Sequence, residues 1–151
     1  DLIKLLQDLK FKSAIVKIKD GDRKLNGNGI KNYFYYKKIF EKYFDKEMTI
    51  NLEVVMGDLV EKLPKTKFIL GGLSTSIIEA LKCKVPYYFY EPSENGYNKK
   101  VLGSIKLFTK NKIARDIFML KKNITNENFI PFKMKNIEYS KSLFHINFKN
   151  I

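Results

Sequence analysis

The sequence predicts an α/β fold built on a parallel sheet. Short apolar segments rich in β-branched or aromatic residues alternate along the chain with segments of helical period, and polar or glycine-containing turns join them. This alternation is typical of parallel strands linked by crossover helices. With 151 residues the chain has the size of about one domain. We therefore expect a Rossmann-like, three-layer arrangement in which helices flank one parallel sheet.

The N-terminal part of the chain supplies the first helices and strands. LIKLLQDLK, residues 2–10, has apolar residues at helical spacing, and SAIVKIK, residues 13–19, is a short β-rich run. A polar loop with three glycines, residues 20–29, precedes a helical pattern at 29–44. The aromatic residues of that helix fall broadly on one side, which favours packing on a sheet over base stacking. NLEVVM, residues 51–56, is the next expected strand.

The remaining elements are expected in the same alternating order. A short helix runs from Asp58, as N-cap, to Leu63 and is stopped by Pro64. The elements after it are a strand at 67–70, a turn at 71–76, a helix at 77–83, a strand at 85–90, a loop at 91–100, a strand at 105–109 and a helix at 112–122. Residues 1–122 then form the α/β domain, and 123–151, which lack a clean period, form a C-terminal tail that packs on it or extends it.

The charge of the chain favours an anionic partner without naming one. The net charge is +13, which is typical of proteins that bind nucleic acid or an anionic membrane. However, only Arg23 and Arg115 among the 29 basic residues are arginines, and phosphate-backbone readers use arginine as well as lysine. The abundance of Lys, Asn and Ile looks like the codon usage of an AT-rich bacterial genome. Nucleic acid is therefore the less favoured partner.

Several classes of site and location are excluded by composition. The single Cys83 and the single His145 provide neither a disulfide framework nor a Cys/His metal cluster. Asp20-Gly-Asp22 is most simply a turn, so no metal is expected. No apolar run approaches the roughly 18 residues of a membrane span, and no signal peptide is visible. We expect a cytoplasmic protein, with peripheral contact to the anionic inner face of the bacterial membrane as a further expectation.

One turn combines glycines with hydroxyl residues and is the candidate ligand site. Gly71 and Gly72 end an apolar strand, and Ser74, Thr75 and Ser76 lead into the next helix. Ligands of open parallel sheets bind outside the carboxyl ends of the strands. Glycines let the backbone approach a ligand, and the free N–H groups at a helix start favour an anion. The pattern predicts a phosphate or diphosphate site.

A purely structural interpretation of the same turn stays open. Ser76-Ile-Ile-Glu79 fits the S/T-x-x-E capping box, in which Ser76 and Glu79 would tie off the helix N-terminus. Capping needs one hydroxyl, so it leaves Ser74 and Thr75 unexplained. The turn matches neither the G-x-x-x-x-G-K-[ST] loop nor the G-x-G-x-x-G fingerprint of other phosphate-binding folds.

The segment FILGGLSTSIIEALKCKVPYYFY resembles the donor-binding C-terminal domain of GT-B-fold glycosyltransferases. There, a strand ending near Ser-Thr or Ser-Ser is followed by a helix with Glu-Ala, then by a small residue or lysine, a proline and a strand. The segment looks most like bacterial sialyltransferase-like and capsule-type enzymes, and like the CDP-glycerol glycerophosphotransferases of wall teichoic acid synthesis. The order of elements from residue 1 to about residue 100 agrees more weakly.

The resemblance implies half of a GT-B fold and a nucleotide-activated donor, with CMP, CDP or UDP as the nucleotide. Glu79 would lie near the ribose or help to hold the turn. Glu91 begins a loop, 91–96, that would line the nucleotide or sugar pocket, although Glu-Pro is also an ordinary strand stop. The residues implied at the donor phosphates are Gly72, Ser74, Thr75 and Ser76.

A lysine stands where the resembled enzymes often carry a histidine. Their Lys-x-His-Pro after the strand matching 13–18 corresponds here to Lys17-Ile-Lys19-Asp20. No family histidine is therefore expected to act in this chain. Lys19, with Arg23 from the glycine-rich loop, is the candidate cation that neutralises phosphate charge as the donor bond breaks. The alternative for Lys17 and Lys19 is a solvated strand face.

Glycosyl transfer also needs a base that deprotonates an acceptor hydroxyl. In the resembled enzymes the base and the site for the glycan or lipid-linked acceptor come largely from an N-terminal domain, which we do not find here. The chain begins at Asp1 with residues already in a helical pattern, so we expect a fragment with little or no turnover alone and assign no catalytic residue. A basic nucleic-acid module and a non-catalytic α/β interaction domain remain as alternatives.

Overall fold

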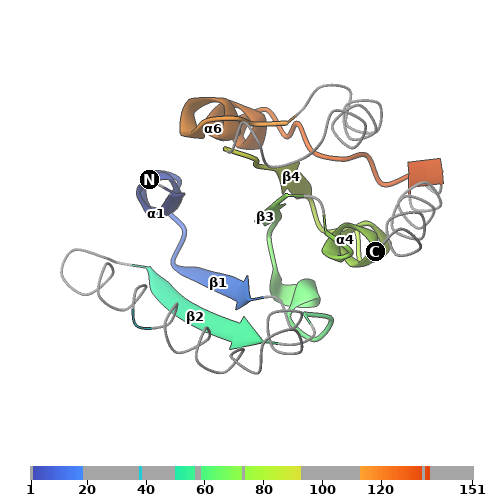
Figure 1. Cartoon of the computed structure of the whole chain (residues 1–151), viewed down its shortest axis with the longest axis horizontal. Coiled ribbons are helices and arrows are strands. Elements are labelled where there is room, and N and C mark those ends of the chain that lie inside the picture. The colour runs from blue at the N-terminus through green and yellow to red at the C-terminus, as the bar shows by residue number, and fades with distance from the viewer. Residues whose placement is uncertain are drawn as a thin grey trace, which may run out of the picture. The chain divides into compact units, whose positions relative to one another are not determined.

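The computed structural model describes residues 2–18, 38, 50–56, 59–72, 74–92, 113–133 and 135–136. The chain divides into two compact units, Asp1–Leu59 and Val60–Ile151. Figure 1 labels their helices and strands, and each unit is described by itself.

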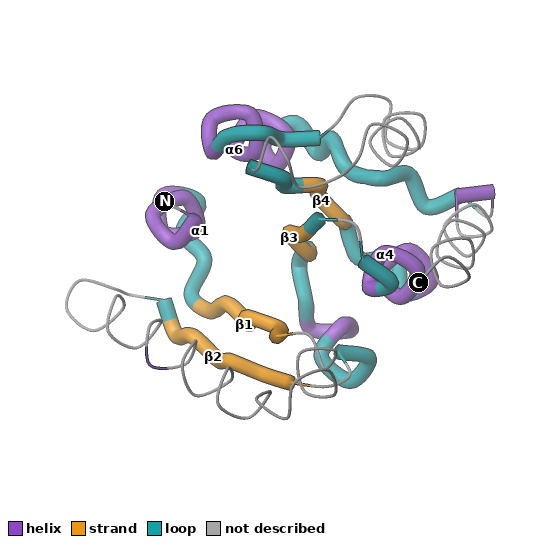
Figure 2. The backbone as a smooth tube through the Cα atoms, viewed as in Figure 1, coloured by secondary structure: helices purple, strands orange, loops and turns teal. Residues whose placement is uncertain are grey.

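The first unit contains one helix and a parallel strand pair. α1 covers Leu2–Asp8, β1 covers Ser13–Ile18 and β2 covers Asn51–Met56. β1 and β2 pair from Ser13↔Asn51 to Ile18↔Met56 (Figure 2). The predicted helix at 2–10 and the strands at 13–19 and 51–56 are confirmed. The predicted glycine-rich loop and aromatic helix lie outside the described residues, except for Lys38.

The second unit is organised around a β-α-β segment. β3 covers Ile69–Gly71, α4 covers Ser76–Lys82 and β4 covers Tyr87–Phe89. The strands are parallel, with Ile69↔Tyr87 and Gly71↔Phe89 as partners. The predicted strand, turn, helix and strand are thus confirmed in order, although both strands are shorter than expected. The predicted strand at 105–109 lies outside the described residues.

β4 is hydrogen-bonded along both of its edges. Alternate residues of a strand direct their backbone N–H and C=O groups to opposite edges. In β4, the odd-numbered residues direct these groups to the edge away from β3. Ala114 N–H donates to Phe89 O at 2.9 Å, and Glu91 N–H donates to Ala114 O at 2.9 Å. Ile130 N–H donates to Tyr87 O at 3.2 Å. Segments that follow β4 in the chain therefore cover this edge.

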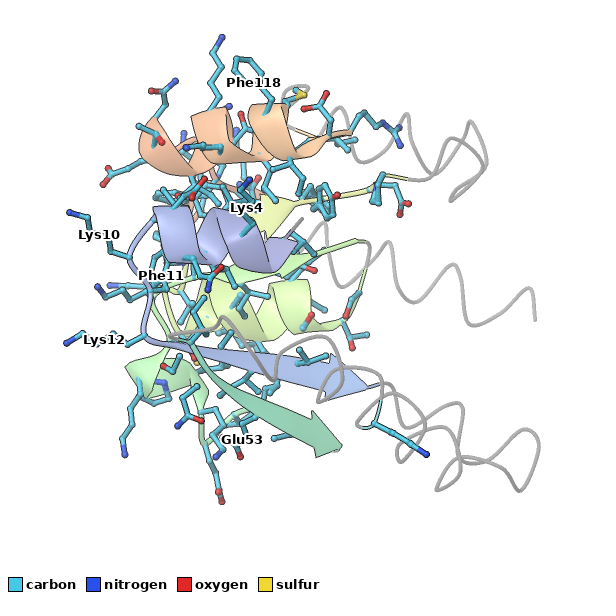
Figure 3. All side chains as sticks on the ribbon, turned by 90° about the vertical axis from the view of Figure 1, so that its left-hand side faces the viewer. Lys4, Lys10, Phe11, Lys12, Glu53 and Phe118 are labelled. Carbon is cyan, nitrogen blue, oxygen red and sulfur yellow. The ribbon has the colours of Figure 1, made fainter. Side chains whose placement is uncertain are left out.

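Helices flank the strand pair of the second unit on both sides. α4 and α6, which covers Ile117–Thr125, each contact β4. Figures 1 and 3 show α6 on one side of β3 and β4 and α4 on the other. The core brings Ile130, from the expected C-terminal tail, together with the strands. Its buried members are Leu63, Ile77, Ala80, Leu81, Val85, Tyr87, Phe89, Ile113 and Ile130.

The predicted helix at 58–63 is wrong in the part that the structure describes. Residues 60–62 form a turn, and a short 3-10 helix, η1, covers Leu63–Lys65. Pro64 lies inside the first turn of η1 rather than ending a helix. Proline fits that place because its missing N–H would have no partner there and its fixed φ is already helical.

The predicted helix at 112–122 begins too early. Ala114 is paired in the sheet, and Asp116 is the N-cap of α6, with its carboxylate accepting a hydrogen bond of 2.7 Å from Met119 N–H. Aspartate is among the preferred N-cap residues because its oxygen satisfies an N–H that has no helical partner. The cap at Asp116 fixes the boundary that the apolar pattern alone misplaced.

Each of the three α-helices that the structure bounds ends in the same way. In α4, Lys84 N–H donates to Leu81 O at 3.3 Å and Val85 N–H to Ala80 O at 2.8 Å. This bond pair defines a Schellman cap, which needs a left-handed residue and usually has glycine there. The same pair of bonds closes α1 and α6. The left-handed residues are Lys10 (φ 59°), Lys84 (φ 55°) and Glu127 (φ 51°).

Candidate functional site

The turn after β3 is hydrogen-bonded to the side chain of Tyr87, a residue of β4. The Tyr87 hydroxyl donates a hydrogen bond of 2.7 Å to the carbonyl oxygen of Gly72, and only 1% of the Tyr87 side chain is exposed. A Cβ at Gly71 would lie 2.6 Å from that hydroxyl oxygen. The absence of a side chain at Gly71 is therefore explained by the close approach of Tyr87. From the sequence we expected it to serve the approach of a ligand.

The start of α4 is capped differently from the prediction. Ser74 Oγ accepts a hydrogen bond of 3.2 Å from Ser76 N–H, and Ser74 O accepts one of 3.1 Å from Ile77 N–H. Ser76 is the first helical residue, after Thr75 at the N-cap, whose side chain makes no cap bond. The alternative interpretation as a Ser76–Glu79 capping box is therefore wrong, because Ser76 lies inside the helix and its N–H, which Glu79 would accept, is bonded to Ser74 Oγ.

The three hydroxyls of the turn have different environments. The hydroxyl oxygens of Ser74 and Ser76 are 2.8 Å apart and share a hydrogen bond. Ser76 is buried, with 9% of its surface exposed, whereas Thr75 is exposed. Thr75 therefore presents the hydroxyl that solvent or a ligand reaches first, and Ser74 and Ser76 chiefly shape the turn.

Glu79 holds a buried carboxylate oxygen that has no hydrogen-bond partner among the described residues. Its Oε2 atom is inaccessible to solvent and makes no hydrogen bond. Glu79 lies three and four residues after Ser76 and Thr75, and helical side chains lean toward the N-terminus, so its carboxylate lies on the same face as those two residues. Buried polar atoms are nearly always hydrogen-bonded to protein or to ordered water, so Oε2 is a polar atom that the described residues leave unsatisfied.

Two charged residues follow the neighbouring parallel segments at the same edge of the sheet. Ala114 pairs with Tyr90 in the parallel sense. Glu91 follows Tyr90, Arg115 follows Ala114, and Arg115 Nη1 donates a hydrogen bond of 3.1 Å to Glu91 O. Since the carboxyl ends of parallel segments share one edge, the turn, Glu91 and Arg115 belong to three successive strand ends.

Arg115 is a candidate that the sequence interpretation missed. The helix expected at 112–122 included Arg115, which gave this residue no relation to the turn. Recognising Asp116 as an N-cap, with Ile113 and Ala114 as a short apolar run before it, would have put Arg115 at a strand end. The structure does not test the predicted roles of Lys19 and Arg23, because these residues and Asp20 lie outside the described residues.

Tyr90 adds a neutral phenol close to this edge. Burial raises the pKa of its hydroxyl, and the negative charge of Asp116 raises it further. The phenol therefore stays protonated at neutral pH and is able to donate a hydrogen bond.

The described residues offer no site for a metal. They contain no group of three or more His, Cys, Asp or Glu side chains that could hold an ion. The same residues also include no helix that is both long and apolar enough to cross a bilayer.

Comparisons with protein-family models, with curated proteins and with solved structures gave no match. The resemblance of residues 68–90 to the donor-binding domain of GT-B-fold glycosyltransferases therefore stays a prediction from sequence.

Proposed function

We propose that this chain is the donor-binding part of a bacterial glycosyltransferase. It would hold a nucleotide-activated sugar or glycerol phosphate during synthesis of a surface polysaccharide or lipooligosaccharide. The observation that carries the proposal is the shared sheet edge, where the hydroxyl turn, Glu91 and Arg115 follow three successive parallel segments. Such an edge is where open α/β sheets bind their ligands.

The residues of this edge suit the two chemical parts of such a donor. Thr75 offers an exposed hydroxyl, and Arg115 offers a guanidinium whose planar fork matches phosphate oxygens. The carboxylates of Glu79 and Glu91 accept hydrogen bonds from ribose or sugar hydroxyls. Lys19, which lies outside the described residues, stays a proposal from the sequence pattern for a further cation.

The chemistry assigned to the chain is binding and charge stabilisation. Negative charge builds up on the leaving phosphate as the donor bond breaks, and cations and hydroxyl donors that are already in place lower the energy of that state. The acceptor site and the base would come from another domain. The chain alone is then expected to bind the nucleotide without turning over the donor.

The fold belongs to the same proposal. We propose a Rossmann-like α/β fold, which the parallel strand pair within each unit and the crossover helix between β3 and β4 support. Its location would be the cytoplasm, where nucleotide-activated donors are made.

The test is an NMR titration of the chain with CMP, CDP, UDP and GDP. We expect one nucleotide to shift the amides of residues 72–76, 91 and 115 selectively. Thr75→Val should weaken its binding about fivefold, the value of one hydrogen bond, and Arg115→Gln by more than about tenfold, because that bond is charged. Lys82→Gln, which removes a positive charge at the far end of α4 from the turn, should leave affinity unchanged.

Other results would separate the alternatives. Shifts that are equal for all nucleotides and vanish with added salt would support the nucleic-acid module, whose binding is dominated by phosphate charge. No shift at any nucleotide concentration, in a folded protein, would contradict donor binding by this chain and favour an interaction domain.

A further inference from the structure

The outer face of α6 carries an aromatic side chain in an otherwise cationic and polar surface. Phe118 is 80% exposed, more than any other large apolar residue in the described part of the chain. Figure 3 shows its ring on the outer side of α6. A single exposed apolar residue is common, so its neighbours decide whether it means anything.

The helix places lysines on both sides of this ring. With about 100° of rotation per residue, Lys121 and Lys122 lie one turn beyond Phe118, one on each side of it, and Thr125 lies in line with it. All four residues are exposed, and none is acidic. Leu120 and Asn123, on the opposite side of α6, are buried. α6 is therefore amphipathic, but its solvent face combines positive charge with one large aromatic ring.

We propose that this face of α6, made by Phe118, Lys121, Lys122 and Thr125, docks on an anionic lipid surface. The lysines would lie among the anionic headgroups, and the phenyl ring would enter the boundary between headgroups and acyl chains. Binding to a lipid interface gains strength from buried apolar area together with attraction of basic residues to anionic lipids, and this face offers both. The net charge of +13 adds a long-range attraction to the same surface.

Charge complementarity favours a membrane over a protein partner. Lysine is depleted in protein interfaces, whose centres are apolar and closely packed. One ring between two lysines offers no such centre. An anionic bilayer, in contrast, strengthens binding by about fivefold for each lysine near its surface.

A tryptophan in place of Phe118 tests the contact directly, because the chain contains no tryptophan of its own. In Phe118→Trp we expect emission typical of exposed tryptophan without lipid. Vesicles of phosphatidylcholine mixed with phosphatidylglycerol should shift it to shorter wavelength, and phosphatidylcholine alone should not. Phe132→Trp, at a residue with 37% exposure outside α6, is the control and should respond less.

Co-sedimentation with the same vesicles tests the lysines. Lys121→Gln/Lys122→Gln should weaken binding roughly 25-fold, as two lysines at about fivefold each. Lys133→Gln/Lys135→Gln removes the same charge from exposed positions elsewhere in the second unit and should have a much smaller effect. Equal losses in the two pairs would overturn the proposal, because binding would then follow net charge alone. Emission at short wavelength without lipid would also overturn it, since another protein surface would already cover the ring.

Discussion

The hydroxyl of Tyr87 lies beneath the turn that follows β3 and donates a hydrogen bond of 2.7 Å to the carbonyl oxygen of Gly72. It also fills the space in which a Cβ at residue 71 would stand. One buried side chain thus fixes both the shape of the turn and the residue that precedes it.

Gly71→Ala is expected to destabilise the protein by about 1–3 kcal/mol, as overpacking a buried contact does. In Tyr87→Phe, which costs about 1 kcal/mol by losing the hydrogen bond, the same alanine should cost much less because the clashing oxygen is gone. Urea unfolding of the four proteins in this double-mutant cycle measures the coupling. Additive losses would mean that Tyr87 is not what excludes a side chain at residue 71.

Ser74→Ala and Thr75→Val should separate folding from binding in the turn. Ser74 caps α4, so its loss should cost about 1 kcal/mol of unfolding free energy. Thr75 is exposed and makes no cap bond, so its replacement should leave stability within about 0.5 kcal/mol. Thermal unfolding checks both values. Equal destabilisation would show that the Thr75 side chain also supports the turn.

Glu79→Gln should stabilise the ligand-free chain. A buried charged oxygen without a partner costs about 1–3 kcal/mol or more, and a neutral amide at the same place costs less. The same change should weaken nucleotide binding if the carboxylate accepts ribose hydroxyls. Glu79→Gln should therefore raise the free energy of unfolding and lower the affinity for nucleotide, as measured by urea unfolding and NMR titration. A loss of stability instead would reveal a structural partner for Glu79.

Stability should fall in alkaline solution because two tyrosines have raised pKa values. Burial raises the pKa of Tyr88 and Tyr90 above 10.0, with smaller contributions from Glu127 and Asp116 respectively. Above about pH 10 the unfolded chain loses these protons first, so the unfolding free energy decreases until the folded pKa values are passed. Tyr88→Phe/Tyr90→Phe should flatten urea-unfolding measurements across this range. An unchanged slope would assign the effect to other groups.

The order of elements was predictable because local patterns determine it. The apolar runs at 13–19 and 51–56 contain enough β-branched residues to specify strands, and the segment 67–90 carries strand, turn, helix and strand in sequence. Boundaries were less predictable. Pro64 was expected to end a helix and instead lies inside one, and Asp116 begins a helix that the apolar pattern had started earlier.

The site was predicted only in part because side-chain bonds across the sheet are not visible in sequence. The hydroxyl residues of the turn were recognised, but the capping interpretation that stayed open named Ser76, whereas the side chain that bonds a helix N–H is that of Ser74. Spacing alone does not distinguish these two serines. Pairing of Ala114 with β4 brings Arg115 to the sheet edge, and the bond of Ile130 to β4 brings that residue into the core. Both contacts join residues that are far apart in the chain, so local patterns do not reveal them.

The residues at the three Schellman caps lower the stability of the folded chain relative to glycine. Glycine at Lys10, Lys84 or Glu127 would relieve a left-handed conformation that costs other residues about 1 kcal/mol or more. Each of these helix ends therefore stores backbone strain that a glycine substitution would release without touching the turn, Glu91 or Arg115.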